Sequence, residues 1–564
     1  MRILLLVCIS FLTSVSVQAQ KVTHSSDNAE VYFGPQQERQ EGEAVAQFIA
    51  EFDDGFLLYR RNRESFGFEY RDLELEVVRK GKVSVPKVKG KVKQAYDFIQ
   101  TGNRVFMLFA TTEKKEKRNI LYLQELDLES LKLKDSPRQL AKIEGKEFYG
   151  NFKKAFPQTA ISPDGSKVMI AFKQPKSEDK SHNYWFMVFD KNMNEIWQSS
   201  INLAMGDGKL HVGGMHRRGQ VIDRSVMGLK RMLPGGMNAF EVDNNGRVNA
   251  WAEYWDPDME KAGKNEAQEI RLYFLRILED GLTTRNFYLP TEDEKLIDPK
   301  TLGIFYQENG DIVVTGYYSN SVEKKEMAKI LIGVNGVFHM VYDFDNEQIK
   351  EHIFNEFGSD FITKYLWDRS RFGKKSGTNG GLGTGGGIPN LTLRIHDNLE
   401  DGSLLLMGEV YYVKSYRDDK GRVSYEYASI NIYLTYLNAD GSVAWNRVVP
   451  KFQERDHGPA GHGFVAILNG YKLHLLYNDN YKNVEADWDG KTVFKFLTGN
   501  SVTLATIDLK KPDSMTREQV FNAESLGGSM FMLKTLGKQI NPNTYMMYVK
   551  GGRGMERFVK LEMK

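Results

Sequence analysis

Two short stretches of this chain place histidines at the same spacing. Four residues separate His211 from His216. Four residues also separate His457 from His462, and Asp456 directly precedes this second pair. Imidazole nitrogens and carboxylate oxygens are ligands that zinc and copper take in proteins. If the two stretches met in space, these side chains would suit a divalent metal ion. Each stretch alone has too few ligands, and the alternative is that the histidines bind only backbone groups or water.

The first pair lies in a basic segment, 204–236, in which cationic side chains outnumber carboxylates. Five of its cations are candidate ligands for an anion or for an acidic partner surface: Arg217, Arg218, Arg224, Lys230 and Arg231. Guanidinium and ammonium groups hold phosphate, carboxylate or an acidic glycan through charge-assisted hydrogen bonds. The alternative is that the segment is a solvated basic loop.

No other pattern predicts a reaction. The chain has no G-x-S-x-G sequence of the kind that carries a nucleophilic serine. Residues 381–386 match G-x-G-x-x-G, but a dinucleotide loop must follow a strand and open a helix, and this segment leads into a predicted strand. Carboxylates are abundant, and no spacing singles out an acid–base pair. We therefore predict no catalytic and no cofactor-binding residue, and the divalent metal is the one cofactor that the sequence suggests.

The elements that would position these residues are marked by a recurring turn. An acidic or amide residue followed by glycine stands between two apolar runs at Asp54-Gly55, Asp164-Gly165, Asn245-Gly246, Asn309-Gly310, Asp401-Gly402 and Asn469-Gly470. Tight hairpin turns need positive φ angles, which Gly, Asn and Asp tolerate best. A hairpin unit that recurs along one chain predicts a repeat architecture.

The repeat unit is four antiparallel strands, and its second strand is apolar on both faces, as in 105–110 and 168–172. Such a strand is buried on both sides, as it is between stacked sheets. Four-stranded units repeated around an axis form a β-propeller. The sequence therefore predicts an all-β fold with a single propeller of eight four-stranded blades, at about 44–90, 93–142, 155–203, 237–290, 302–346, 390–452, 462–523 and 529–563. Seven blades, or two smaller halves divided near 346–390, are the alternatives.

The last of these units has only three good strands. A ring must close without leaving an exposed edge. The isolated strand 30–33, ahead of the first blade, is expected to complete the last blade from outside. The chain thus divides into a signal peptide (1–19), an N-terminal segment with the closing strand (20–43), and a propeller (44–564) with insertions at 204–236 and 346–389.

The expected connections between strands differ on the two sides of the ring. Turns from the first to the second strand and from the third to the fourth are short, whereas the other connections include 112–118, 175–183, 255–268, 414–427 and 478–500. Long loops in a compact domain are usually functional, so the long-loop side is the expected working face. The alternative is that these loops are tolerated insertions. Within one insertion, 346–371 carries Ile349, Ile353 and Phe357 at helical spacing and is predicted to be an amphipathic helix.

The N-terminal residues predict export. Arg2 is followed by an apolar run, 3–15, that is too short to span a bilayer, and residues 17–19 offer small side chains for cleavage. Cys8 is the one cysteine, so the mature chain has no thiols. No second run is long enough for a transmembrane helix, and a net charge of +2 does not favour nucleic acid. We expect a periplasmic or outer-membrane-associated protein rather than a fully secreted one.

Two motifs resemble those of known envelope propellers. Residues 162–165 (Ser-Pro-Asp-Gly), followed by the apolar run 167–172, resemble the blade signature of TolB-type and other WD40-like propellers. Residues 438–445 and 192–197, each a turn that ends in tryptophan, are similar to the outer turn of secreted propellers of Bacteroidetes-type bacteria. The resemblance covers most of the chain as a pattern and is specific in two or three blades. It implies a propeller fold and an extracytoplasmic setting, and it implies no activity.

These observations favour a binding or scaffold protein over an enzyme. Rigid blades present loops at low entropic cost, so we expect the long-loop face to hold a protein or surface-polymer partner, for example in an outer-membrane secretion or assembly complex. The alternative is a hydrolase or lyase that acts on a glycan, a peptide or an acidic small molecule in the mouth of the ring, assisted by a metal ion if the two histidine stretches meet. The sequence does not indicate an oligomeric state.

Overall fold

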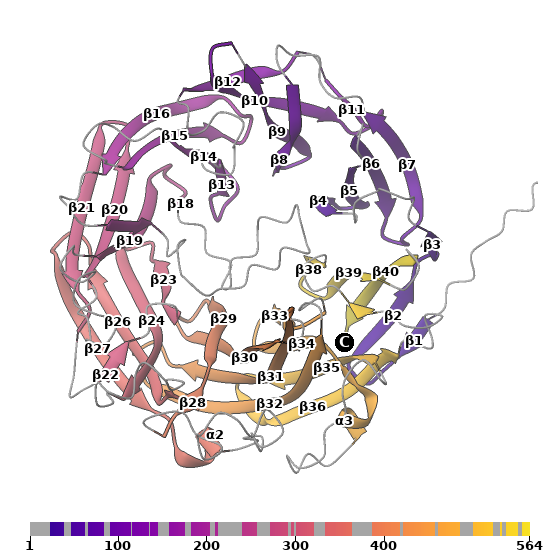
Figure 1. Cartoon of the computed structure of the whole chain (residues 1–564), viewed down its shortest axis with the longest axis vertical. Helices are drawn as coiled ribbons and strands as arrows, with labels where there is room; N and C mark the ends of the chain where they lie inside the picture. Colours follow the sequence, from indigo (N-terminus) through magenta and orange to yellow (C-terminus); the bar gives the residue numbers. More distant parts are fainter. Residues whose placement is uncertain are drawn as a thin grey trace, which may run out of the picture.

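The chain forms a ring of eight antiparallel sheets around a central axis (Figure 1). This computed structural model describes residues 23–38, 47–61, 66–83, 91–113, 115–134, 136–144, 157–174, 182–203, 209–212, 240–255, 271–290, 295–297, 301–320, 333–363, 386–417, 421–456, 461–485, 500–522, 531–532, 537–550 and 555–564. The predicted signal peptide, 1–19, lies outside these residues. The all-β propeller with eight blades, predicted from the repeated turns, is confirmed.

The first four blades follow one another along the chain. Blade one contains β4 (Gln47–Phe52), β5 (Gly55–Arg61), β6 (Phe66–Asp72) and β7 (Val77–Val83). Blade two contains β8 (Lys91–Thr101), β9 (Arg104–Glu113), β10 (Arg118–Asp127) and an outer strand in two pieces, β11 (Lys132–Leu133) and β12 (Arg138–Glu144). Blade three contains β13 (Gln158–Ile161), β14 (Lys167–Lys173), β15 (His182–Asp190) and β16 (Glu195–Leu203). Blade four contains β17 (Lys209–Val212), β18 (Phe240–Val242), β19 (Val248–Trp255), β20 (Arg271–Leu278) and β21 (Gly281–Tyr288).

The next three blades carry the two described helices. Blade five contains β22 (Lys295–Ile297), β23 (Gly303–Tyr306), β24 (Asp311–Asn320), β26 (Gly336–Asp343) and β27 (Gln348–Glu356), which α2 (Ser359–Thr363) follows. A separate pair, β25 (Gly333–Val334) and β28 (Ile388–Pro389), precedes blade six, which contains β29 (Leu391–Asn398), β30 (Leu404–Arg417), β31 (Val423–Leu437) and β32 (Val443–Asp456). Blade seven contains β33 (Phe464–Asn469), β34 (Lys472–Asn480), α3 (Tyr481–Glu485), β35 (Asn500–Asp508) and β36 (Lys511–Asn522).

Blade eight is built from both ends of the chain, as the isolated strand 30–33 predicts. It contains β37 (Phe531–Met532), β38 (Lys538–Asn541), β39 (Thr544–Lys550) and β40 (Met555–Met563). The N-terminal strand β2 (Ala29–Phe33) pairs with β40, and β1 (Thr23–Ser25) and β3 (Gln37–Glu38) extend the same sheet. Because the two termini share one sheet, the ring cannot open without breaking a strand pair.

Buried charges join blade eight to blade one at this closure. Glu556 on β40 forms an ion pair with Arg60 on β5 and accepts a hydrogen bond from Tyr548 on β39. On β6, Arg71 is fully buried, forms an ion pair with Glu69, and donates to the backbone oxygen of Leu75 at 2.6 Å. Breaking such pairs would leave unpaired charge in the interior, so they hold the two blades in one register.

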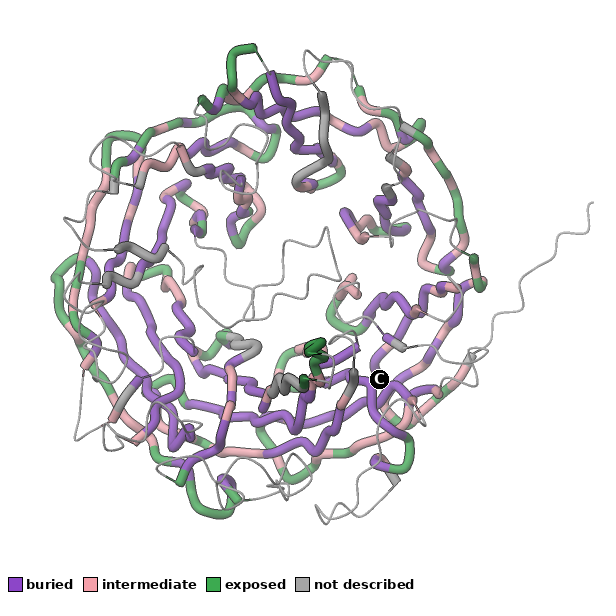
Figure 2. The backbone as a smooth tube through the Cα atoms, in the orientation of Figure 1, coloured by how far each residue is buried: buried purple, intermediate pink, exposed green. Residues whose placement is uncertain are grey.

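The core is divided among the interfaces between blades. Each of the eight apolar clusters is formed by two neighbouring blades, from blades one and two to blades eight and one. The second strands pack on both faces; β9, for example, is buried from Val105 to Glu113. Figure 2 shows burial concentrated on the middle strands and exposure at turns and on the outer strands. The sheets therefore stack face to face around the axis, as the non-alternating second strands predict.

Five of the six glycines in the predicted turns have positive φ angles, between 56° at Gly470 and 92° at Gly310. The exception is Gly55, which begins β5. A Cβ atom there would lie 2.1 Å from the backbone oxygen of Arg71, so this position needs glycine for close approach rather than for its φ angle. The turn signal is thus confirmed for two different physical reasons.

Two sequence predictions about secondary structure are wrong. The helix predicted at 346–371 is a strand over Gln348–Glu356, followed by only one turn of helix, α2. A bulge opposite Val341 and Tyr342 breaks the alternation of this strand, so Ile349, which pairs with Tyr342, and Ile353, which pairs with His339, lie on opposite faces. Apolar residues four apart therefore imitate a helical face. The loop predicted at 414–427 is mostly the hairpin of β30 and β31, whose strands run to Arg417 and from Val423.

Three innermost strands are divided in two, which the sequence pattern does not show. β17 and β18 both pair with β19, β22 and β23 both pair with β24, and β37 and β38 both pair with β39. Residues 209–212, inside the predicted insertion at 204–236, thus belong to the sheet of blade four. The short pieces were missed because strands of two to four residues carry too little periodicity to detect.

Candidate functional site

The ring has two unlike faces. Turns from the first to the second strand and from the third to the fourth emerge on one face, which we call the short-turn face; the remaining connections emerge on the other, the long-loop face. Every connection of the first kind lies within the described residues, and each is only a few residues long. The longest gaps between described strands, such as 213–239, 364–385 and 486–499, fall in connections of the second kind or between the two pieces of a divided inner strand.

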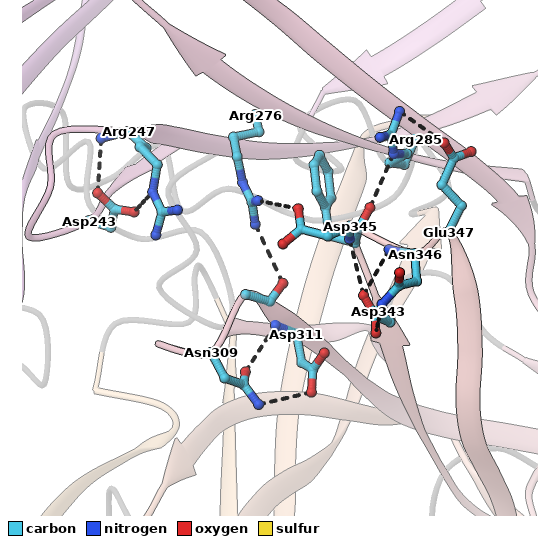
Figure 3. Close-up of polar contacts among 12 residues, drawn as sticks. Asp243, Arg247, Arg276, Arg285, Asn309, Asp311, Asp343, Asp345, Asn346 and Glu347 are labelled. Atoms are coloured by element: carbon cyan, nitrogen blue, oxygen red, sulfur yellow. Dashed lines mark hydrogen bonds and ion pairs between the residues drawn. The ribbon is translucent and has the colours of Figure 1, made fainter.

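Polar side chains on the short-turn face bind the turns of the same face. Figure 3 shows this array in blades four and five. Arg276 donates to Asp345 Oδ1 at 3.0 Å and to the backbone oxygen of Gly310 at 3.4 Å. Arg285 donates from Nε to the backbone oxygen of Phe344 at 3.1 Å. These contacts join adjacent blades and use up hydrogen-bonding groups that a ligand would otherwise need.

Two tryptophans of the turn motifs join neighbouring blades in the same way. Trp197 Nε1, on the outer strand of blade three, donates to the backbone oxygen of Gly246 in blade four at 3.1 Å. Trp445 Nε1, on the outer strand of blade six, donates to the backbone oxygen of Leu509 in blade seven at 2.9 Å. Buried indole groups need such a partner. The turn-and-Trp motif is therefore explained by blade packing.

On the long-loop side, a buried polar network underlies blades six and seven. Lys451 on β32 and Glu409 on β30 form an ion pair, and both side chains are fully buried. Lys451 Nζ also donates to Gln453 Oε1 at 3.0 Å. The Gln453 side chain accepts from the backbone nitrogen of Gly463 at 2.6 Å and donates to the backbone oxygen of Asn478 at 2.7 Å. Blade six thereby fixes the segment that leads into blade seven.

A second amide extends this network to blade eight. Asn478 on β34 donates to the backbone oxygens of Gly461 at 2.8 Å and of Met532 at 2.9 Å, and accepts from the backbone nitrogen of Met532 at 3.0 Å. The Asn478 side chain thus binds the backbone of β37 in blade eight through both a donor and an acceptor, as a paired strand would. Because buried amides are costly to leave unsatisfied, this arrangement fixes one geometry.

Asp479, the next residue, is a buried carboxyl group. Its Oδ1 accepts from the backbone nitrogen of Asn480 at 2.7 Å and from Asn483 Nδ2 at 2.6 Å. None of the described residues donates a hydrogen bond to its Oδ2. Burial raises the pKa of Asp479 to about 7, against the smaller opposing effect of these donors and of Lys451. A carboxyl with a pKa near neutrality can hold or release a proton, which is the chemistry that this network offers.

Above this network the strands of blade six extend into an exposed hairpin. β30, β31 and β32 are the longest strands in the chain, at 14, 15 and 14 residues. Near the tip, Val423 is 45% exposed and Tyr425 is 49% exposed. Tyr481, at the start of α3 in blade seven, is 36% exposed. Large apolar side chains held in solvent on a rigid support are typical of a binding surface. We call Val423, Tyr425 and Tyr481 the rim residues.

The predicted metal ligands that the structure describes are distributed over three blades. His211 is on β17 in blade four, and Asp456 is the last residue of β32 in blade six; their side chains lie outside the described set. His462 is buried between Gly461 and Gly463, at the start of blade seven. His216 and His457 lie outside the described residues, so the metal site stays a prediction. Within the described residues, no three His, Cys, Asp or Glu side chains gather as a metal group would.

The predicted anion ligands, which are Arg217, Arg218, Arg224, Lys230 and Arg231, also lie outside the described residues, and anion binding stays a prediction. Sequence reasoning missed Glu409, Lys451, Gln453 and Asn478. Glu409 and Lys451 are single polar residues inside strands, and nothing in their spacing marks them as partners. Asn478 to Asn480 belong to the predicted loop 478–500, whereas they form the end of β34.

No family model matches this sequence, and no curated protein resembles it in sequence. Solved structures resemble its fold. Prolyl oligopeptidase B from Galerina marginata has a TM-score of 0.33 at 6% identity, covering 92% of this chain and 55% of its own, so this chain spans about half the length of that peptidase. A polysaccharide lyase has a TM-score of 0.34 at 11% identity, covering 85% and 91%. The β-propeller domain of the Trilobed protease from Pyrococcus furiosus has a TM-score of 0.30 at 9% identity, covering 86% and 96%. These likenesses concern the fold alone.

None of the helices in the described part of the chain has the length and apolar character needed to cross a bilayer.

Proposed function

We propose that this protein is an envelope-associated binding propeller that holds a partner on its long-loop face. The observation that carries the proposal is the extended hairpin of blade six, where Val423 and Tyr425 are exposed above a buried network that fixes blades six, seven and eight. Apolar side chains that are already ordered lose little entropy on binding. On the short-turn face, polar groups such as those of Arg276 and Arg285 bind the turns of the neighbouring blade.

The setting of this function is inferred from the sequence. The apolar N-terminal run and the resemblance to TolB-type and Bacteroidetes-type propellers support export to the periplasm or outer membrane. An outer-membrane secretion or assembly complex would supply a protein partner, and the cell surface would supply a polymer. The proposal is that the long-loop face recognises one of these.

The proposal is tested by affinity capture from envelope extract. The double variant Val423→Asp/Tyr425→Asp is expected to lose a stoichiometric partner that the wild type retains. Ile196→Asp is the matched control, because Ile196 is 45% exposed on the outer strand of blade three. A deletion confined to 364–385 examines the insertion without removing β27 or β28. Equal recovery by the wild type and the double variant would contradict the proposal.

A second candidate function is a hydrolase or lyase acting on a glycan, a peptide or an acidic small molecule. The observation in its favour is Asp479, a buried carboxyl whose pKa is raised to about 7 and whose Oδ2 accepts no hydrogen bond from the described residues. This candidate predicts that Asp479→Asn abolishes turnover of one of these substrates while partner capture is unchanged. Turnover that survives Asp479→Asn would remove this role for the residue.

A further inference from the structure

Among the described residues, the inner edge of strand β30 has a longer stretch without a paired strand than the second strand of any other blade. In each blade the innermost strand pairs with the second strand and lies on its axis side (Figure 1). In blade six, β29 pairs with β30 from Leu404 to Val410 only, and the Tyr411 nitrogen still donates to the backbone oxygen of Asn390 at 3.2 Å. Among the described strands, none pairs with the inner edge of β30 over residues 412–417.

Other blades leave much less of this edge open. In blades four, five and eight, the short strands β17, β22 and β37 pair with the far end of the second strand and cover it. In blades one and three, the second strand extends two residues past its partner. In blade seven, the Asn478 side chain binds Gly461 and Met532 where the pairing stops. The open edge of blade six is longer, roughly 20 Å at about 3.3 Å per residue.

The backbone groups along this edge are arranged for a further strand. Because the Tyr411 nitrogen points to the inner edge, alternate residues after it point the same way, which are Val413, Ser415 and Arg417. The residues between them, 412, 414 and 416, lie opposite Ala428, Glu426 and Ser424 of β31, and their backbone groups face that strand. Amide and carbonyl groups thus recur every two residues, at about 6.8 Å. Another extended polypeptide matches this repeat, and the irregularly spaced hydroxyl groups of a glycan do not.

The chain itself shows what covers such an edge. In three blades the covering piece is a short extended segment, antiparallel to the second strand. The segment just before β29 in blade six does not do so, because Ile388 and Pro389 pair with β25 of the preceding connection. The open edge lies on the axis side of blade six, as the innermost strands of the other blades do.

We propose that the edge of β30 at residues 412–417 binds an extended, proline-poor segment of a partner protein, which adds to blade six as an antiparallel strand. This inference rests on the proposed binding function and names the partner as a polypeptide rather than a surface polymer. Main-chain hydrogen bonds supply the affinity in this mode of recognition. A proline facing β30 would remove one donor, so the segment lacks proline at those positions.

The test uses the full mature chain and a displayed library of random twelve-residue peptides. Peptides selected on the wild type are expected to bind Ser415→Ala equally well and Ser415→Pro roughly fivefold more weakly or worse, because Ser415→Pro removes one edge donor and leaves the pairing with β31. Hydrogen exchange on the wild type needs no variant. A bound peptide is expected to slow exchange at Val413, Ser415 and Arg417, whereas the amides of residues 412, 414 and 416 are already slow in the free protein.

Several outcomes would overturn the inference. Slow exchange at Val413, Ser415 and Arg417 in the free monomer would mean that the chain covers its own edge. Protection that appears only with dimerisation would identify a second copy as the occupant. Equal binding to Ser415→Pro and Ser415→Ala would place the peptide elsewhere. If the envelope partner is lost by Val423→Asp/Tyr425→Asp but kept by Ser415→Pro, the proposed function holds and this inference fails; if neither variant loses it, both fail.

Discussion

The short-turn face and the long-loop face of the ring use their polar groups differently. On the short-turn face, Arg276, Arg285 and the two turn-motif tryptophans donate to backbone oxygens of neighbouring turns, so blade is bound to blade at the surface. On the long-loop side of blades six to eight, the side chains of Gln453 and Asn478 make the corresponding bonds inside the protein, and Val423 and Tyr425 are exposed at the end of the blade-six hairpin. This difference supports the proposal that the long-loop face holds the partner.

The largest loss of stability is expected when the buried ion pair of blade six is disrupted. Lys451→Met is expected to lower the free energy of unfolding by about 3–5 kcal/mol, because the buried Glu409 carboxylate then loses its ammonium partner. The double variant Lys451→Met/Glu409→Leu is expected to recover most of this loss. Urea unfolding measures both. A loss of under about 1 kcal/mol in the single variant would mean that the pair is solvated and that the rim is not rigidly supported.

Two turn glycines test how closely the turns of the short-turn face pack against the neighbouring blade. A Cβ atom at Gly441 would lie 2.3 Å from Cδ2 of His339 in blade five, whereas at Gly165 nothing lies within 4 Å, and both residues have positive φ. Gly441→Ala is expected to cost about 2–4 kcal/mol and Gly165→Ala about 1 kcal/mol in thermal unfolding. Equal costs would show that the turn of blade six is not packed against blade five.

The pH dependence of stability tests whether Asp479 is protonated in the folded protein. Its pKa is raised to about 7 from an ordinary value of 3.8, so between these values the folded protein holds a proton that the unfolded chain has lost. The free energy of unfolding therefore falls as pH rises from about 4 to 7, by up to about 1.4 kcal/mol per pH unit from this group.

Asp479→Asn is expected to remove that slope. Burial lowers the pKa of His474 to about 4, which gives a pH dependence of the opposite sign in both proteins. Subtracting the stability of the variant from that of the wild type cancels this contribution and leaves that of Asp479. Urea unfolding at several pH values supplies the measurement. Parallel stability curves for the two proteins would contradict the buried, protonated carboxyl.

The smallest effect is expected at a tryptophan between blades. Trp197→Phe removes the hydrogen bond to the backbone oxygen of Gly246 and keeps most of the apolar contact. A loss of about 1 kcal/mol is expected in thermal unfolding, with partner capture unchanged. Loss of capture in this variant would connect the short-turn face to binding and would remove the contrast between the faces.

The sequence predicts the ring well and its rim poorly, for physical reasons. Positive-φ glycines such as Gly165 and Gly402 are local signals, and the strand that closes the ring was recognisable because it had no neighbour in its own blade. Lys451 pairs with Glu409 on another strand of blade six, and Gln453 and Asn478 bind backbone groups of the neighbouring blades. Single polar residues within strands carry no periodic signal for such contacts. The strand at Ile349 and Ile353 was mistaken for a helix because a bulge disturbs its alternation.

The central claim, that the long-loop rim is the working face, is tested most directly by site-specific photo-crosslinking in cells. A benzophenone amino acid is placed at Tyr425, which is 49% exposed at the rim, and separately at Val78, which is 52% exposed beside the short turn that precedes β7 in blade one. We predict a discrete crosslinked adduct from position 425 and none from position 78. An adduct from position 78 alone would contradict the account.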